Sequence, residues 1–430
     1  MSRRFEARHL GLGAASALVV GNMVGAGVFT TSGFALADLG DPGLVLLAWA
    51  VGAGVALCGA LSYGGLAARI PRSGGEYVFL SESLHPVAGL LAGWVSLLAG
   101  FTAPIALAAL VFATYLEAGS GLALAPRLTA TALIALFTAL HGLRLREGVG
   151  LQNGIVALKL LALLAFCGIA TLAGDGSPTL PPTPTAHFPL TAFATSLVWI
   201  SFSFSGWNGA VYLAGEIRDP ERNLPRALWL PTLGVGVLYL ALNAAFLGSG
   251  PPATLAGQAD IASIAAEHIG GAPLRRALSL VICIALLTSV SAMMMSGPRV
   301  YAQMARDGWL PPVLLRGADA PTAAILLQGA LAILVVWIAP LATLLSYLGF
   351  TLSLSAALAV VGALRLRARE GAAAVPIPFF PLPPLLFLLF TLGSAGFLVL
   401  RDPVPAGVGL LTLLSGLALY PWARRRFRSE

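Results

Sequence analysis

The stretch Gly21-Asn22-Met23-Val24-Gly25-Ala26-Gly27-Val28-Phe29 interrupts an apolar run that covers residues 10–37. Its glycines lower helix propensity in the middle of a segment that is long enough to cross a bilayer. A helix that unwinds in lipid must place its freed backbone groups against protein or a water-filled cavity. Once unwound, the amides of Gly25, Ala26 and Gly27 would open a second half-helix, and a helix N-terminus is a natural seat for a carboxylate.

A second polar interruption, Ser201-Phe202-Ser203-Phe204-Ser205-Gly206-Trp207-Asn208-Gly209, lies in the apolar run 190–216. Either stretch alone could equally be a small-residue packing face. The two interrupted runs are the first and the sixth, so they take matching positions in two repeats of five. Because five is odd, these repeats must be inverted, and matched interruptions of this kind indicate a transporter site. Each break offers amides at one end and carbonyls at the other, which suits a zwitterionic amino acid.

Composition places the whole chain in a membrane. Of its 430 residues, 58% are hydrophobic and 10% are charged, whereas a soluble domain carries roughly 25% charged residues. These values exclude a disordered chain, a disulfide scaffold and a typical cytosolic enzyme. We predict twelve membrane spans, and expect tilt or interruption in the four longest: 10–37, 43–68, 86–115, 127–143, 151–174, 190–216, 227–249, 276–304, 322–339, 341–363, 378–399 and 404–422.

The arginines set the orientation. If both termini are cytoplasmic, 20 arginines face the cytoplasm and 4 face outwards, as the positive-inside rule requires. This distribution explains the net charge of +7 without a nucleic-acid partner. The strong preference for arginine over lysine, together with abundant alanine, leucine and glycine, is typical of a GC-rich bacterial coding sequence, so we expect a multi-pass protein of the bacterial inner membrane. Two outer loops are long: the proline-rich 175–189, expected to be a connector, and 250–275, whose stretch Ile261–Ile264 predicts a surface helix that either connects or gates.

Titratable residues exclude a membrane-embedded enzyme. None of the 18 acidic residues lies near the middle of a predicted span, and the five histidines share no ligand spacing. An intramembrane metal site or carboxylate pair would need such groups, so we predict no enzyme, no metal and no cofactor. Cys58, Cys167 and Cys283 lie inside apolar runs without metal or redox spacing. Because none lies in an outer loop, we expect no disulfide-tethered accessory subunit.

Lys159 is the only lysine of the chain. It lies about nine residues into the span 151–174, about 13 Å deep and close to the bilayer midplane. The side chain either snorkels toward the interface, or its ammonium stands beside the first break in place of a coupling cation. In the second case Thr288, Ser289 and Ser291 are candidate partners, although such hydroxyls often bond only their own helix.

These residues resemble the amino acid–polyamine–organocation transporters, and most closely the L-type-like amino acid transporter branch. The similarity covers nearly the whole chain and rests on five motifs in order. They are Met23-Val24-Gly25-Ala26-Gly27-Val28-Phe29, Pro71-Arg72-Ser73-Gly74-Gly75-Glu76-Tyr77, Gln152-Asn153 with Lys159, Gly206-Trp207-Asn208 with Glu216 to Pro225, and Pro298-Arg299 with Ala305 to Pro311.

The resemblance implies an all-α polytopic membrane protein with a five-plus-five inverted repeat that works by alternating access. The repeats would cover 1–175 and 176–370, and two extra helices 371–430. The substrate carboxylate would bind amides of the first break, and the amino group the Val24 carbonyl and carbonyls near Phe202. Phe202 falls at the family's aromatic gate, and Lys159 matches a lysine that replaces sodium. The family often has serine at Ala26, so a hydroxyl donor is missing here. The predicted substrate residues are Val24, Gly25, Ala26, Gly27, Phe202, Ser203, Ser205, Gly206 and Asn208, with Lys159 and Ser289 at the cation position.

The predicted function is secondary-active transport of neutral L-amino acids, by exchange or coupled to protons. The absence of an acid inside the spans favours neutral substrates. Cationic amino acids or polyamines are the alternative, because carbonyls and aromatic rings also bind cations. A non-transporting amino acid sensor would show binding without flux. The major facilitator fold also has twelve spans, but it divides after the sixth span with a long central loop, and here that junction is short.

Overall fold

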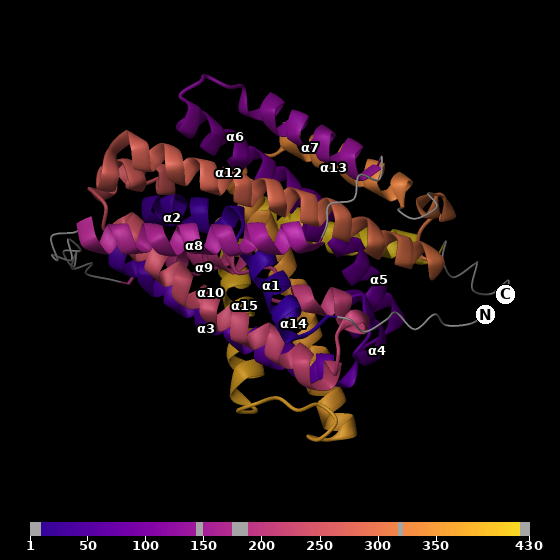
Figure 1. Ribbon diagram of the computed structural model, residues 1–430. Helices are drawn as coiled ribbons and strands as arrows, with labels where there is room; N and C mark the ends of the chain where they lie inside the picture. Colours follow the sequence, from indigo (N-terminus) through magenta and orange to yellow (C-terminus); the bar gives the residue numbers. More distant parts are fainter. Residues whose placement is uncertain (1–9, 143–148, 174–187, 317–320, 422–430) are drawn as a thin grey trace.

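The computed structural model describes residues 10–142, 149–173, 188–316 and 321–421, and nearly all of this part is helical (Figure 1). Its one β-type contact is an isolated bridge between Leu10 and Ile217. The α-helices are α1 (Leu12–Met23), α2 (Ala26–Leu39), α3 (Pro42–Arg69), α4 (Glu76–Ser83), α5 (Pro86–Val95), α6 (Ala103–Ser120), α7 (Pro126–Gly142), α8 (Val149–Ala173), α9 (Leu190–Ser203), α10 (Pro220–Leu247), α11 (Pro252–Leu255), α12 (Ile261–Arg306), α13 (Thr322–Ile338), α14 (Leu341–Glu370), α15 (Leu382–Arg401) and α16 (Pro403–Ser415). Shorter turns are η1 (Ser96–Thr102, a π-helix) and the 3-10 helices η2 (Gly209–Glu216), η3 (Pro312–Leu315) and η4 (Gly416–Leu419).

Many of these helices suit a bilayer. Within the described residues, 8 helical stretches are long and apolar enough to cross a membrane, and α9, α13 and α16 are shorter apolar helices. Large apolar side chains on the outside, such as Leu172 at 88% exposure and Leu400 at 81%, would contact lipid rather than water. The chain is therefore a multi-pass membrane protein, as its composition predicts.

Three of the four longest predicted spans are interrupted by irregular backbone. The first breaks between α1 and α2, and the predicted sixth span leaves helical geometry after Ser203. The third runs through the π-helix η1, which directly precedes Pro104. Proline lacks the N–H that would continue the ladder, and this favours a local change of helix geometry. The interruption expected in 190–216 is therefore present: α9 ends at Ser203, and the 3-10 helix η2 follows from Gly209.

The stretch Ile261–Ile264 opens α12, and it is mostly buried rather than a surface helix as predicted. A kink at Gly270 and Gly271, where the second glycine has φ of 66°, separates it from the apolar part of the helix. Ile261 is fully buried, and the amide of nearby Gly257 donates to the Gly33 carbonyl at 2.7 Å. This loop therefore packs against the middle of α2. By contrast, α4 is a helix where the sequence predicts only a loop, and most of the predicted connector 175–189, like the repeat boundary at 175/176, lies outside the described residues.

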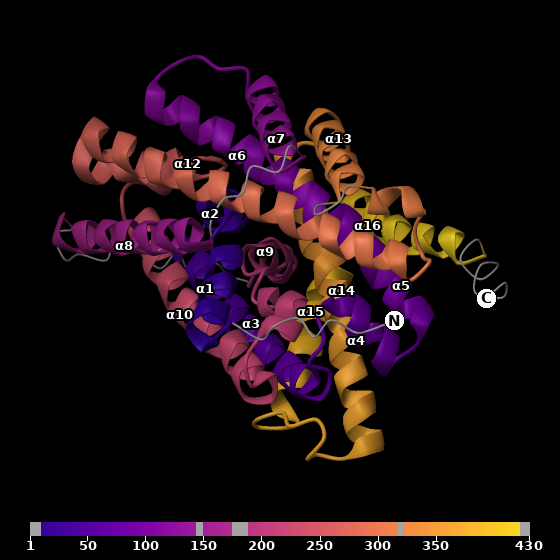
Figure 2. The same cartoon turned by 45° about the vertical axis from the view of Figure 1, so that its right-hand side comes forward.

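The broken helices lie at the centre of the molecule. Figure 2 shows α9 nearly end-on, with α1 on one side and α14 on the other. Around it, α9 contacts α2, α3, α14 and α15, while α1 packs on α8 and α10. Three further pairs lie side by side: α3 with α10, α6 with α12, and α7 with α13. The surrounding helices thus enclose both breaks and keep their free backbone groups away from lipid.

Candidate functional site

Glycines let the two breaks cross in contact. A Cβ on Gly206, which has φ of 97°, would lie 2.8 Å from the carbonyl carbon and oxygen of Asn22. A Cβ on Gly27 would lie 2.5 Å from the Cα of Ser203. Both approaches are too close for any side chain, so each break supplies a glycine where the backbone of the other passes. The sequence predicts both breaks, and the structure brings them together.

A cavity of 590 Å³ lies at this crossing. The first turn of α2 opens into it, and the first amides of a helix have no acceptor inside that helix. Nearly all predicted substrate and cation-site residues line this cavity. They are Gly25, Ala26, Gly27, Phe202, Ser203, Ser205, Gly206, Asn208 and Ser289.

Lys159 reaches the first break from α8. Its side chain is 2% exposed, and Nζ donates to the carbonyls of Val24 at 2.9 Å and Gly21 at 3.3 Å. The ammonium is therefore directed to the end of α1 and not to the membrane interface. The Val24 carbonyl, which the resemblance assigns to the substrate amino group, has Lys159 as its partner, and Val24 does not line the cavity. A carbonyl oxygen has two lone pairs, so a role of Val24 in substrate binding stays a prediction.

Ser289 of α12 lies beside the same break. Its Oγ would be 3.8 Å from a Cβ on Gly25, and the hydroxyl donates to the Ala285 carbonyl one turn back at 3.0 Å. Thr288 also donates to Ala285, at 2.7 Å. These hydroxyls thus bond their own helix, the behaviour that is common for serine and threonine in membrane helices.

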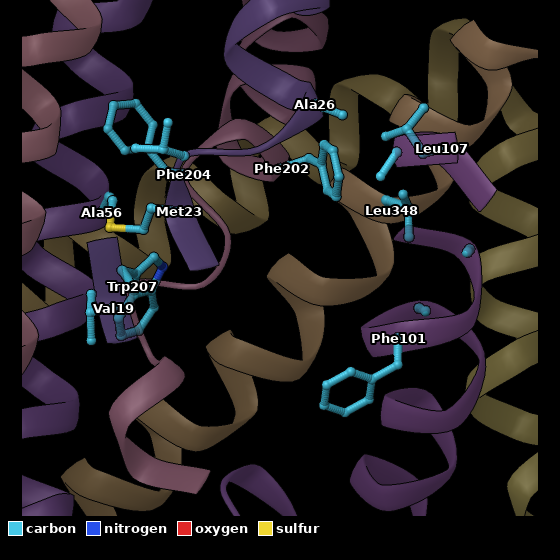
Figure 3. Close-up of a cluster of buried hydrophobic side chains, with 14 of the residues drawn as sticks. Val19, Met23, Ala26, Ala56, Phe101, Leu107, Phe202, Phe204, Trp207 and Leu348 are labelled. Carbon is cyan, nitrogen blue, oxygen red and sulfur yellow. The ribbon is translucent and has the colours of Figure 1, made fainter. Parts of the chain in front are cut away.

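Phe202 lies at the end of α9 with 7% of its surface exposed. Figure 3 shows its ring just below Ala26, with Leu107 of α6 and Leu348 of α14 to the right of it and Phe101 of η1 lower on that same side. Phe101 and Phe202 both line the cavity. The predicted gate residue therefore lies between the amide end of the first break and the surrounding helices.

Tyr239 of α10 contacts both breaks, and the sequence analysis does not identify it. Its hydroxyl lies 2.6 Å from the Met23 carbonyl and 3.2 Å from the Ser203 carbonyl, and it can donate to either. The residue is fully buried, and its ring packs edge-on against Trp49 at 5.5 Å between centroids. A tyrosine inside the apolar span 227–249 is a signal that could have found it, because a buried phenol needs an acceptor.

Glu76, which the sequence places in a motif but not in the site, also lines the cavity. Its carboxylate is buried and accepts hydrogen bonds from the Tyr212 hydroxyl at 2.6 Å, the Tyr63 hydroxyl at 3.2 Å and the Asn208 amide. Glu76 precedes the third span, so the count of acids within spans overlooks it. An acid therefore does line the cavity, and the argument from the absence of one is wrong, although neutral donors occupy this carboxylate.

The cavity extends from the breaks toward the C-terminal end of α12, where exposed Arg299 and Arg306 line it. The other end of the molecule is held together. Arg401 at the end of α15 pairs with Asp38 near the end of α2, and the loop before α12 covers Gly33. Among the described residues, the cavity lining thus reaches the end of the molecule that carries Arg299 and Arg306, and it includes neither Gly33 nor Asp38.

An all-helical membrane protein whose central cavity is built from two crossed helix breaks belongs to the class of solute transporters. The description "Amino acid permease" matches residues 10–408, so the chain belongs to that family. This confirms the predicted membership of the amino acid–polyamine–organocation permeases, and with it a transporter rather than an enzyme.

Curated proteins of this family are similar over almost the full chain. The human "Large neutral amino acids transporter small subunit 2" is 29% identical over 433 residues, which cover 96% of this chain and 80% of the relative. The mouse "Asc-type amino acid transporter 1" is 27% identical with the same coverage. The "Serine/threonine exchanger SteT" of Bacillus subtilis is 27% identical over 437 residues, 97% of each chain.

Proposed function

We propose that this protein is a secondary-active transporter that moves neutral L-amino acids by alternating access. The proposal rests on one observation: the free amides of α2 and the carbonyl ends of α1 and α9 lie at the same cavity. A carboxylate suits the amides, and an ammonium suits the carbonyls. The printed names of the relatives, which refer to large neutral amino acids and to serine and threonine, agree with this substrate class.

In this proposal the amides of Gly25, Ala26 and Gly27 hold the substrate carboxylate. Carbonyls near Phe202 hold the amino group; the Phe202 carbonyl also accepts from the Ser205 amide at 2.8 Å, and a second lone pair remains. The ring of Phe202 closes over the bound amino acid. The other proposed wall residues are Ser203, Ser205, Gly206 and Asn208.

Lys159 supplies the fixed positive charge of the site. In place of a coupling cation, its ammonium holds the end of α1 against α8. Moving α1 away from α8 would leave this buried ammonium without acceptors. The Ser289 hydroxyl lies close enough to the first break to contact its backbone when α1 moves. Whether the chain exchanges substrates or co-transports protons is decided by comparing uptake into empty and preloaded vesicles, with and without a pH gradient.

The proposed topology has twelve spans with both termini in the cytoplasm. Helices at all twelve predicted ranges support it, as do the arginine distribution and the packing of α3 on α10, α6 on α12 and α7 on α13. These pairs join equivalent helices of inverted repeats at 1–175 and 176–370, followed by the extra helices of 371–430. In this orientation the protein lies in the inner membrane of a bacterial cell, and its cavity opens to the cytoplasm.

A second substrate class follows from Glu76. A carboxylate that lines the cavity could attract the cationic side chain of a basic amino acid or a polyamine. Competition decides between the two classes: neutral amino acids, but not arginine or spermidine, should inhibit uptake at comparable concentrations. Preferential inhibition by the cationic compounds would reverse the assignment.

The decisive experiment reconstitutes the purified single chain in proteoliposomes. We expect exchange of a labelled neutral amino acid without an accessory subunit, although the human relative is named a small subunit. Saturable binding without flux would identify a sensor. Folded protein that neither binds nor transports any amino acid would refute the proposal.

A further inference from the structure

The segment between α3 and α5 carries a carboxylate that is not one of the proposed substrate contacts. Glu76, the first residue of α4, is 5% exposed. Tyr212 and Asn208 donate to it from the chain after the second break, and Tyr63 donates from α3. Because a buried carboxylate needs its donors, these bonds hold the three segments together.

The loop before α4 contacts the same part of the second broken helix. The amide of Gly215 in η2 donates to Ser73 Oγ at 3.0 Å. Gly75 has φ of 59°, and a Cβ there would lie 2.3 Å from the Tyr212 ring, so only glycine allows this approach. Ser73, Gly75 and Glu76 therefore all contact the stretch 208–218, which we call the inner segment.

The inner segment also holds the start of α1. The amide of Leu10 donates to the Glu216 carbonyl at 3.0 Å, and the amide of Arg218 donates to the Leu10 carbonyl at 2.9 Å. These bonds tie the first half of one broken helix to the second half of the other. Whatever positions the inner segment therefore also positions the start of α1.

The remainder of α4 is fastened to helices outside the breaks. Tyr77 donates to Asp307 at the end of α12, at 2.6 Å. A Cβ on Gly362 of α14 would lie 2.2 Å from Ser83 Oγ, and Gly89 of α5 approaches α4 as closely. Such contacts leave no room for α4 to slide on α14 or α5.

Glu76 and Tyr77 both line the cavity, as do exposed Arg299 and Arg306 at its open end. Two neighbouring residues of one short helix thus connect the moving and the surrounding parts at the opening. Glu76 holds the inner segment, and Tyr77 holds α12.

We propose that α4 couples the inner segment to α12 during transport, and that Glu76 is the positioning residue of this coupling. The carboxylate fixes the inner segment and the start of α1 relative to α12. These parts therefore move together when the opening closes. Glu76 acts on the substrate only through Asn208 and the inner segment. This inference rests on the proposed transport function.

Flux and binding separate this role from others. In Glu76→Ala we expect the exchange rate to fall about tenfold or more, while the dissociation constant for the amino acid changes by less than about threefold. Glu76→Gln keeps one acceptor oxygen and should fall between Glu76→Ala and the wild type. The matched control is Glu82→Gln on the same helix, which removes a surface carboxylate that pairs with Arg72, and it should exchange at the wild-type rate.

A reporter cysteine measures the opening directly. Ser296→Cys, in a background with Cys58, Cys167 and Cys283 replaced by alanine, places a thiol on the cavity wall. A membrane-impermeant maleimide applied from the side of Arg299 should label this thiol several-fold faster in Glu76→Ala than in wild type, because the opening no longer closes.

A double variant tests whether the two contacts form one path. If Glu76 and Tyr77 act in series, Glu76→Ala/Tyr77→Phe should exchange no more slowly than the slower single variant, since either change already separates the inner segment from α12. Slowing by the product of the two single effects would overturn the coupling. Should Glu76→Ala not fold, Tyr212→Phe removes one donor oxygen of the same contact, and an exchange rate equal to wild type would then contradict the proposal.

Other outcomes are also informative. A loss of affinity that matches the loss of rate would make Glu76 a substrate ligand. A Glu76→Gln variant as slow as Glu76→Ala, with a rate that no longer depends on pH, would make it a proton carrier. Either result overturns the coupling role. Failure of the transport function itself would look different, because the wild-type protein would then show no flux.

Discussion

Replacing Lys159 with methionine removes the ammonium from the first break and nearly preserves the side-chain volume. The carbonyls of Val24 and Gly21 then lose their bonds of 2.9 and 3.3 Å. A hydrogen bond to a charged group contributes about 1.5–3 kcal/mol, so one well-formed and one long bond together contribute about 2–4 kcal/mol. At tenfold per 1.4 kcal/mol, the arrangement that holds α1 against α8 would become about 30 to 700 times less populated.

The assay is exchange of a labelled neutral amino acid in proteoliposomes, with binding measured on the same preparation. We expect the initial exchange rate of Lys159→Met to fall at least about 30-fold. Lys159→Arg, which keeps the charge with a different shape, should retain more activity than Lys159→Met. Leu161→Met is the matched control, because this neighbour on α8 is 65% exposed on the outside of the molecule. Exchange by folded Lys159→Met within about twofold of wild type would refute the reasoning, since the two bonds would then contribute less than about 0.5 kcal/mol.

Three further substitutions test the crossing of the breaks. Phe202→Ala should raise the apparent KM about tenfold by opening the gate above the substrate; an unchanged KM and rate in an uptake titration would remove this ring from the site. Gly27→Ala places a Cβ 2.5 Å from the backbone of the second broken helix, so binding and exchange should both fall about 10- to 100-fold. The control Gly13→Ala on α1 has nothing within 4 Å and should behave as wild type; equal behaviour of the two variants would argue against the crossing. Tyr239→Phe deprives the Met23 carbonyl of a donor at 2.6 Å and should slow exchange about tenfold, with a melting temperature within a few degrees of wild type; wild-type exchange would show that this bond has no role in transport.

Much of the fold follows from local sequence. Apolar runs of suitable length identify helices at their approximate positions, because an isolated backbone in lipid has to satisfy its own hydrogen bonds. Glycine-rich interruptions identify both breaks for the same reason. The depth of Lys159 follows from its position in its span, since the rise per residue of a helix is constant. None of these inferences depends on knowing which helices are neighbours.

The contacts that the sequence did not predict share a different cause. Tyr239 and Met23 are 216 residues apart in the chain, and Glu76 and Tyr212 are 136 apart. No periodicity within a single helix encodes such pairs. The contact of Lys159 with the Val24 carbonyl likewise joins residues that are 135 positions apart.

By itself, the sequence determined that this is a polytopic membrane protein, where its helices run and where two of them break. These properties depend on composition, glycine content and helix geometry, which act over a few turns of chain. Only the tertiary structure decided that Gly27 and Gly206 bring the breaks into contact, which carbonyls Lys159 and Tyr239 occupy, and that Glu76 lies in the cavity wall. Those features depend on side chains from separate helices meeting at contact distance, and helix packing alone sets such distances.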